Sequence, residues 1–465
     1  MTATKTVAQT LAAYIHGLDY SEIPPEVAAR AKALLLDQLG CELIGSTVEW
    51  NQAVYRFVHE NKQGGPATIV SYGDHVPPDD AALVNGTFGQ GCELDDYYDQ
   101  GGGHPGAATV PVAMALAQRR CITGKQVIAA LAAGYEIGWR LGRALLPEMM
   151  RRGYHAQGVV GVFIAAAAAA RLLGLDENQT AHALAIAGSH ASGTMEYDQS
   201  GGEVKRAHNG IACSGGLRSA MLAEQGLTGP PTIFEGERGI LKVFSGKCET
   251  EPLIGRLGSD FAVMHGAVKR FPVNASQHAP IELLENLIRE HRIRPVDVSA
   301  IEVGVNEAVI LHGGSIVEPM EVIQAQFSLR FSLALRLLKG SNDLMFYLDP
   351  AMWHARDILD AVKKITLVAD PAAQGNRRFA CKMKLTLNDG RTVSGQIDAP
   401  KGTSANPLTQ EEIRDKFFRL GSSALPADQL RQIADRVEAL ETEQDISIVA
   451  SLLIDRTASH SMNFH

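Results

Sequence analysis

Carboxylate and imidazole side chains, which can exchange protons, gather near residue 100. The acidic run Glu93-Leu94-Asp95-Asp96-Tyr97 is followed by glycines 101–103 and then by His104-Pro105. Proline suits the first turn of a helix, so we expect a helix to begin beside His104. The free N–H groups of a helix start favour an anion. The segment predicts an acid, a base and an anion site close together; the alternative is a solvated acidic turn with His104 as a helix cap.

More basic side chains follow along the chain. Tyr154-His155 precedes an apolar segment, Lys205-Arg206 comes shortly before His208, and His278 follows Phe271-Pro272. Each of these alone is typical of an ordinary core or surface residue. Taken together they favour acid–base chemistry, because histidine titrates near pH ~6.5 and a lysine can bind a carboxylate.

Signatures of cofactor enzymes and common hydrolases are missing from the sequence. Residues 101–106 match G-x-G-x-x-G formally, but an acidic run precedes them instead of an apolar strand. We find no G-x-x-x-x-G-K-[ST], H-E-x-x-H or G-x-S-x-G. The sequence therefore predicts no metal and no organic cofactor.

Composition excludes several classes of partner. A formal charge of −9 lacks the basic excess of nucleic-acid-binding proteins. The six cysteines are scattered without C-x-x-C, which indicates a reducing, cytoplasmic compartment. The N-terminus does not read as a secretory signal. The longest apolar run, 159–170, is shorter than the ~20 residues that cross a bilayer, so we expect a buried core helix and no membrane partner.

The patterning of the chain predicts two domains, since 465 residues exceed what one core usually holds. Up to about residue 265, apolar residues recur at helical spacing; Pro25 should open a helix, and Pro111 should lie near the start of another. Later the period changes to that of strands, with Asn388-Asp389-Gly390 as a hairpin turn. We expect a helix at 327–338 and three helices after Thr409.

These patterns predict a mainly α protein with a smaller α+β domain. Residues 1–268 plus 400–465 should form a large all-helical domain. Residues 269–399 should form the α+β domain with an antiparallel hairpin.

Several ordered motifs resemble one known family. They are Val84-Asn85-Gly86-Thr87-Phe88-Gly89, Glu93-Leu94-Asp95-Asp96, His104-Pro105-Gly106, Gly153-Tyr154-His155, Lys205-Arg206-Ala207-His208-Asn209-Gly210, Lys269-Arg270-Phe271-Pro272 with His278, Ala325-Gln326-Phe327-Ser328-Leu329, and Leu337-Leu338-Lys339-Gly340. This set is similar to the MmgE/PrpD family, which includes 2-methylcitrate dehydratase, cis-aconitate decarboxylase and iminodisuccinate epimerase. The resemblance implies a two-domain, MmgE/PrpD-like architecture with a site between the domains, a homodimer, and no metal or organic cofactor.

The motifs and the resemblance assign roles to individual residues. Expected catalytic residues are His104, His155, Lys205, Glu93 and Asp96. Expected substrate-binding residues are Asp95, Tyr97, Tyr154, Arg206, His208 and His278.

Two departures from the family pattern affect the expected pocket. Family members commonly read Asp-Phe-Asp-Asp-Thr where this chain has Glu93 first and Tyr97 last. A tyrosine of the decarboxylase would fall near Ile316, where this chain has none. These differences predict a pocket that differs in shape from those of other family members. They also argue against cis-aconitate itself as substrate.

The expected function is that of a cofactor-independent hydro-lyase. It would act on a small hydroxylated di- or tricarboxylate of the 2-methylcitrate type by removing a proton next to a carboxylate. Lys205 and imidazolium groups would stabilise the developing negative charge. The alternatives are an epimerase or decarboxylase of a related polycarboxylate, or a carboxylate-binding homologue without activity. The retained histidines argue against the last, since binding alone needs fewer proton-transfer groups.

Overall fold

The computed structural model describes residues 5–62, 64–99, 101–373, 377 and 379–455. The chain divides into two compact units. The helical unit contains Met1–Gly91, Asp95–Gly266 and Thr409–His465, and the mixed unit contains Cys92–Leu94 and Ala267–Leu408. The predicted fold class, mainly α with a smaller α+β part, is confirmed.

The helical unit is built from segments at both ends of the chain. Its helices are α1 (Val7–Gly17), α2 (Pro25–Gly45), α3 (Gln52–Asn61), α4 (Pro78–Gln90), α5 (Pro105–Ala117), α6 (Gly124–Leu145), α7 (Glu148–Arg151), α8 (Ala156–Leu173), α9 (Glu177–Ala187), α10 (Tyr197–Ser200), α11 (Val204–Glu224), α12 (Glu251–Ile254), α20 (Gln410–Gly421), α21 (Ala427–Glu438) and α22 (Ser447–Leu452).

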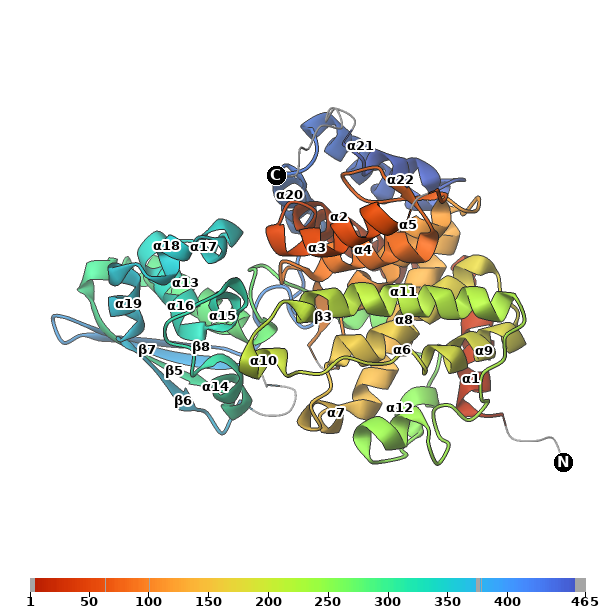
Figure 1. Cartoon of the computed structure of the whole chain (residues 1–465). Helices are drawn as coiled ribbons and strands as arrows, with labels where there is room; N and C mark the ends of the chain where they lie inside the picture. Colours follow the sequence, from red (N-terminus) through yellow and green to blue (C-terminus); the bar gives the residue numbers. More distant parts are fainter. Residues whose placement is uncertain (1–4, 63, 100, 374–376, 378, 456–465) are drawn as a thin grey trace. The chain divides into compact units, whose positions relative to one another are not determined.

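Helix α8 forms the centre of the helical unit (Figure 1). By length and composition it could cross a membrane, but 89% of it is buried within the protein. It contacts helices α5, α6, α9 and α11, which cover its apolar sides. The expectation of a core helix is confirmed, because a helix that is apolar all round is stable in water only when neighbours surround it.

The N-terminal helix α2 packs against the C-terminal helices, as expected from the return of helical patterning after Thr409 (Figure 1). The buried side chains of Asp37 and Lys416 form an ion pair of 2.7 Å between α2 and α20. Helix α2 continues past Gly40, where a Cβ atom would lie 3.3 Å from Phe417 Cα. Gly40 therefore allows close packing and does not end the helix.

Two expectations for the helical unit need correction. Helix α5 begins at Pro105, so Pro111 lies inside the helix and not near its start. The unit is also not purely helical, because β1 (Ala67–Thr68) pairs antiparallel with β2 (His75–Val76). A further short strand, β3 (Asp96–Tyr98), begins within the acidic run.

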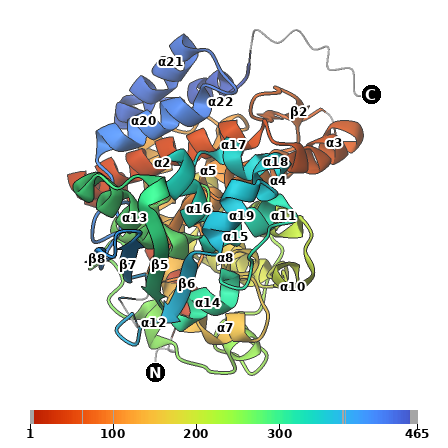
Figure 2. The same ribbon diagram turned by 90° about the vertical axis from the view of Figure 1, so that its left-hand side faces the viewer.

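The mixed unit contains a four-stranded sheet with the order β6-β5-β7-β8 (Figure 2). Its strands are β5 (Val298–Val305), β6 (Ile365–Ala369), β7 (Cys381–Leu387) and β8 (Thr392–Ile397). Strands β5 and β6 are parallel, while β7 pairs antiparallel with β5 and β8. The expected hairpin at Asn388-Asp389-Gly390 therefore joins β7 to β8, with Gly390 at the positive φ of 86° that this turn requires. A short strand, β4 (Gly266–Val268), lies at the start of the unit.

Helices cover one face of this sheet (Figure 1). They pack on a core that includes Ile301, Val303, Met383 and Leu385, and the neighbouring side chains Glu302, Lys382 and Lys384 are exposed. The helices of the unit are α13 (His278–His291), α14 (Glu307–Gly313), α15 (Val322–Phe327), α16 (Leu329–Lys339), α17 (Leu344–Leu348), α18 (Pro350–Trp353) and α19 (Arg356–Val362).

The helix expected at 327–338 corresponds to α16, whose N-cap residue is Ser328. This residue is extended, with ψ at 105°, and its hydroxyl accepts a hydrogen bond of 3.2 Å from Phe331 N. Serine at this position caps a new helix, because its oxygen satisfies an N–H group that has no partner within the helix. The predicted helix is therefore α16, which begins two residues later than expected because Phe327 ends the preceding helix α15.

The short segment Cys92–Leu94 belongs to the mixed unit, although the sequence places it in a helical region. Glu93 Oε2 lies 3.1 Å from Lys269 Nζ, and Gln326 Nε2 donates to Cys92 O at 3.1 Å. Pairing a buried charge is energetically necessary, so these contacts hold the segment to the mixed unit. Such pairing across 176 residues is invisible to local patterning.

Candidate active site

His104 and Asp95 form a hydrogen-bonded pair in the helical unit. The ring nitrogen His104 Nδ1 lies 2.8 Å from Asp95 Oδ2 and 2.8 Å from Asp96 O. A carboxylate and a backbone carbonyl can only accept, so Nδ1 carries the proton. The remaining nitrogen, Nε2, is then the one that can take or give a proton, on a ring that is 18% exposed.

Asp96 holds the corner between β3 and α5. Its buried carboxyl accepts hydrogen bonds from Gly106 N at 2.9 Å and from the Tyr135 hydroxyl at 2.7 Å. Gly106 lies in the first turn of α5, where N–H groups have no helical partner. These contacts hold the start of α5 beside His104, and the expected catalytic role of Asp96 stays a prediction.

Burial raises the pKa of Asp96 to about 7, against a smaller lowering effect of the Tyr135 hydrogen bond. The folded protein therefore binds this proton more tightly than the unfolded chain does. The stability that results is fully present below about pH 4 and is lost as the pH rises through about 7.

Asp96→Asn removes this ionisation and should flatten that part of the pH dependence. We expect the wild-type protein to lose stability relative to the variant by up to ~1.4 kcal/mol per pH unit between about pH 4 and 7. Urea unfolding of both proteins at several pH values measures the difference. A difference that does not change with pH would contradict the assignment of this proton.

His155 and His208 form a second pair in the helical unit. Their Nδ1 atoms lie 2.9 Å apart, and the ring of Tyr197 stands edge-on to both. A bond between two such nitrogens needs one proton and one lone pair, so the two rings share a proton at this contact. Gly193 lies against the His208 ring, where a Cβ atom would meet it at 3.2 Å.

The environment makes His208 the natural acceptor of this pair. Burial lowers the pKa of His208, and the charge of Lys205 lowers it further. A neutral His208 can accept from His155 Nδ1 and so stabilise a His155 imidazolium. The contact with His155 uses Nδ1 of His208, and the expected substrate-binding role of His208 stays a prediction.

Lys205 lies in the first turn of α11, one turn before His208, and is buried. Keeping an ammonium group in a protein interior requires compensating polar groups or charges. The charge of this buried cation acts on His208. The expected role of Lys205 as a carboxylate anchor remains a prediction.

Two residues expected to bind substrate have packing roles. The guanidinium of Arg206 lies 4.3 Å from the centre of the Trp50 ring and donates to Gly91 O, to which Trp50 Nε1 also donates. Tyr154 packs edge-on against Phe244, with ring centres 4.8 Å apart. These contacts hold α11 and the loop before α8 in place, and the expected substrate-binding roles of both residues stay predictions.

The remaining expected residues divide between the units. Tyr97 is buried in β3 of the helical unit. In the mixed unit, Glu93 pairs with Lys269, and its φ of 57° is unusual for a residue other than glycine. His278 begins α13 and is buried against Phe271. Glu93 thus uses its carboxylate in an ion pair that keeps the charge of Lys269 buried.

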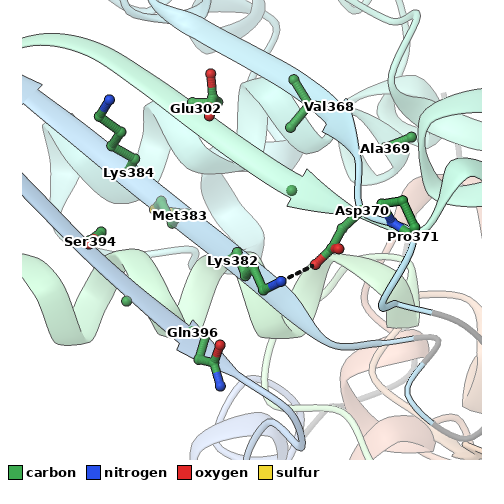
Figure 3. A pocket seen from close by; sticks show the side chains of 12 residues that line it. Glu302, Val368, Ala369, Asp370, Pro371, Lys382, Met383, Lys384, Ser394 and Gln396 are labelled. Carbon is green, nitrogen blue, oxygen red and sulfur yellow. Dashed lines mark ion pairs between the residues drawn. The ribbon is translucent and has the colours of Figure 1, made fainter.

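A hollow of about 510 Å³ lies on the exposed face of the sheet in the mixed unit (Figure 3). Opposite charges line it: Lys382 Nζ lies 3.2 Å from Asp370 Oδ2, and Glu302 is opposite Lys384 in the strand register. Neither sign of charge predominates, and none of the expected site residues lines this hollow. We assign it no part in the chemistry.

In the described part of the chain, no three His, Cys, Asp or Glu side chains are grouped so that they could hold a metal ion.

Sequence reasoning did not find the residues that support the histidines. Tyr135 bonds Asp96, Tyr197 packs on the histidine pair, Gln157 donates to His104 O, and Asn209 bonds to Gln157. The only indication in the sequence was the position of the two amides, because Gln157 lies two residues after His155 and Asn209 directly follows His208. Nothing local distinguishes Tyr135 or Tyr197 from other core tyrosines.

The chain combines a mainly helical unit, which carries the Asp95–His104 and His155–His208 pairs, with a smaller α+β unit. The MmgE/PrpD N-terminal domain matches residues 9–253, and the MmgE/PrpD C-terminal domain matches residues 271–442. The chain therefore belongs to the MmgE/PrpD family, which confirms the expectation from the motifs.

Relatives match the chain over nearly its whole length. The cis-aconitate decarboxylase-like protein oryM of Aspergillus oryzae is 30% identical over 96% of this chain and 97% of its own length. A cis-aconitate decarboxylase of Aspergillus terreus is 28% identical over 97% of this chain and 96% of its own length. The cis-aconitate decarboxylase of Homo sapiens is 27% identical over 97% of this chain and 95% of its own length.

Proposed function

We propose that this protein is a cofactor-independent decarboxylase of a small unsaturated polycarboxylate of the cis-aconitate class. The relatives with decarboxylase names support this reaction over the dehydration of a 2-methylcitrate-type substrate, which the sequence alone favoured. The geometric observation that carries the proposal is the Asp95–His104 pair, which leaves Nε2 as an acid or base.

For the decarboxylation of such a substrate, the protein has to provide a cation and a proton donor. When the bond from carbon to the leaving carboxylate breaks, CO₂ departs and the electron pair remains on the substrate, spread over the adjacent double bond. A cation beside a retained carboxylate stabilises this charge, which is the role proposed for Lys205. A protonated imidazole, of His104 or His155, then gives a proton to carbon and becomes neutral.

The departures from the family pattern point to a substrate other than cis-aconitate. Ile316 stands near the position of the decarboxylase tyrosine, and Glu93 and Tyr97 replace a shorter acid and a small hydroxyl. Displacing a charge by about a bond length can change a rate ~10²-fold. We therefore propose the same reaction on a related polycarboxylate.

Incubation with a panel of polycarboxylates in D₂O tests the proposed reaction. We expect CO₂ release with one deuterium incorporated per product, and we expect turnover to survive chelator treatment and dialysis. The panel includes cis-aconitate, 2-methylcitrate and iminodisuccinate. Alkene formation without CO₂ would establish a dehydratase, and exchange with inversion alone would establish an epimerase. Binding without any turnover would establish the non-catalytic alternative.

A further inference from the structure

Gln157 and Asn209 form a buried pair of amides at the meeting point of four helices. Gln157 Nε2 donates to Asn209 Oδ1 at 2.5 Å, and both side chains are fully buried. Gln157 lies in the first turn of α8, and Asn209 lies on α11. The N–H and C=O groups of a buried side-chain amide need hydrogen-bond partners. These partners therefore fix the orientation of each amide.

Gln157 forms hydrogen bonds with both the backbone N–H and the backbone carbonyl of His104. Gln157 Oε1 accepts from His104 N at 2.7 Å, and Gln157 Nε2 donates to His104 O at 3.2 Å. Because His104 N lies at the start of α5, it has no partner within the helix. A single side chain on α8 therefore fixes the residue whose ring forms the Asp95 pair.

Asn209 extends the same connection to α4 and α5. Its Nδ2 donates to Gly86 O and to Ala107 O, each at 2.7 Å. In a regular helix Ala107 O would accept from the N–H of residue 111, but Pro111 has no N–H. The proline inside α5 thus leaves a carbonyl that Asn209 uses.

The positions of the two amides relate them to the histidines. Gln157 follows His155 by two residues, and Asn209 directly follows His208. One hydrogen-bonded unit therefore connects the backbone of His104 to the segments that carry the histidine pair. A shift of any one of these segments would need a bond of this unit to break.

We propose that Gln157 and Asn209 are positioning residues, which set the spacing between the Asp95–His104 pair and the His155–His208 pair. This proposal rests on the proposed function for its kinetic part. The two amides act through the histidines and do not themselves take part in proton transfer.

The variant Gln157→Leu tests the proposal, with Asn85→Leu as a matched control. Asn85 is also a buried amide of the helical unit held at both ends, since it accepts from Val70 N at 3.0 Å and donates to Thr68 O at 3.1 Å, but it contacts no histidine. We expect Gln157→Leu to lower kcat by ~10²-fold with KM changed by less than about threefold, because misplacement of about 1 Å has such an effect. Asn85→Leu should lose similar stability and keep most of its kcat.

A double variant separates positioning from general loss of stability. If Gln157 acts through His104, then adding Gln157→Leu to His104→Gln should lower kcat little further. Full additivity of the two effects would overturn the proposal. If Gln157→Leu does not fold, Gln157→Asn serves instead, because an amide one methylene shorter cannot reach both His104 and Asn209.

A measurement without substrate keeps the proposal distinct from the proposed function. In protein with ¹⁵N-labelled histidine, the Nδ1 proton of His104 should give a downfield signal, identified by its absence in His104→Gln. We expect this signal to shift or broaden in Gln157→Leu and to stay in place in Asn85→Leu. An unchanged signal in Gln157→Leu would overturn the positioning role, whichever substrate the enzyme uses.

Discussion

Replacing His104 with glutamine is expected to lower kcat/KM by ~10²- to 10⁴-fold, the range of a lost general acid or base. Glutamine has a similar size and can hydrogen bond, but it cannot take up or release a proton near neutral pH. The Asp95 carboxylate and the Asp96 carbonyl both accept from Nδ1, so the structure leaves Nε2 for this task. Steady-state kinetics with the substrate found in the panel measures the loss.

The neighbouring variant Asp95→Asn gives a graded second test. Its amide can still accept from His104 Nδ1, and the Asp96 carbonyl keeps its own contact, so the tautomer is retained. What is lost is the negative charge beside the ring. We therefore expect a smaller loss of kcat/KM than in His104→Gln. Activity of His104→Gln within a few-fold of wild type would remove His104 from the chemistry.

Replacing Lys205 with alanine is expected to lower kcat/KM by at least ~10²-fold, as expected for the loss of one electrostatic stabiliser of the transition state. Lys205 is buried one turn before His208 on α11, and its charge acts on that ring. A substrate carboxylate bound there would lie close to the histidine pair. Kinetics and a thermal melt together distinguish loss of function from loss of fold.

The same variant has a second, independent consequence. Because the charge of Lys205 helps burial to lower the pKa of His208, this pKa should rise in Lys205→Ala. Histidine NMR titration measures the rise without substrate. The matched control is Lys242→Ala, which removes an exposed lysine paired with Glu237 and should change neither value, since exposed pairs contribute little. Near-normal kcat/KM in Lys205→Ala would contradict the proposal that this lysine binds a substrate carboxylate.

The sequence determined the elements with strong local signals. Proline at a helix start, the apolar segment that becomes α8, and the Asn-Asp-Gly turn between β7 and β8 each fix local geometry through backbone sterics or burial. The ordered motifs were enough to predict the family, because their identity depends on residue types and spacing alone.

The tertiary structure decided how the candidate site residues are used. Glu93 and Lys269 are 176 positions apart and yet form one ion pair, which takes Glu93 out of the helical unit. His208 bonds His155, Arg206 covers Trp50, and Asp96 bonds Tyr135, so three expected site residues have other partners.

The hydrogen bonds that hold the candidate site in place also depend on the tertiary structure. Gln157, Asn209 and the Ala107 carbonyl, which Pro111 leaves without its helical partner, form one hydrogen-bonded unit although they lie on three different helices. The physical reason is that a buried polar group must be satisfied by whichever partner the packing brings near it. Residue type states what such a group can donate or accept, and only the folded chain decides which partner it meets.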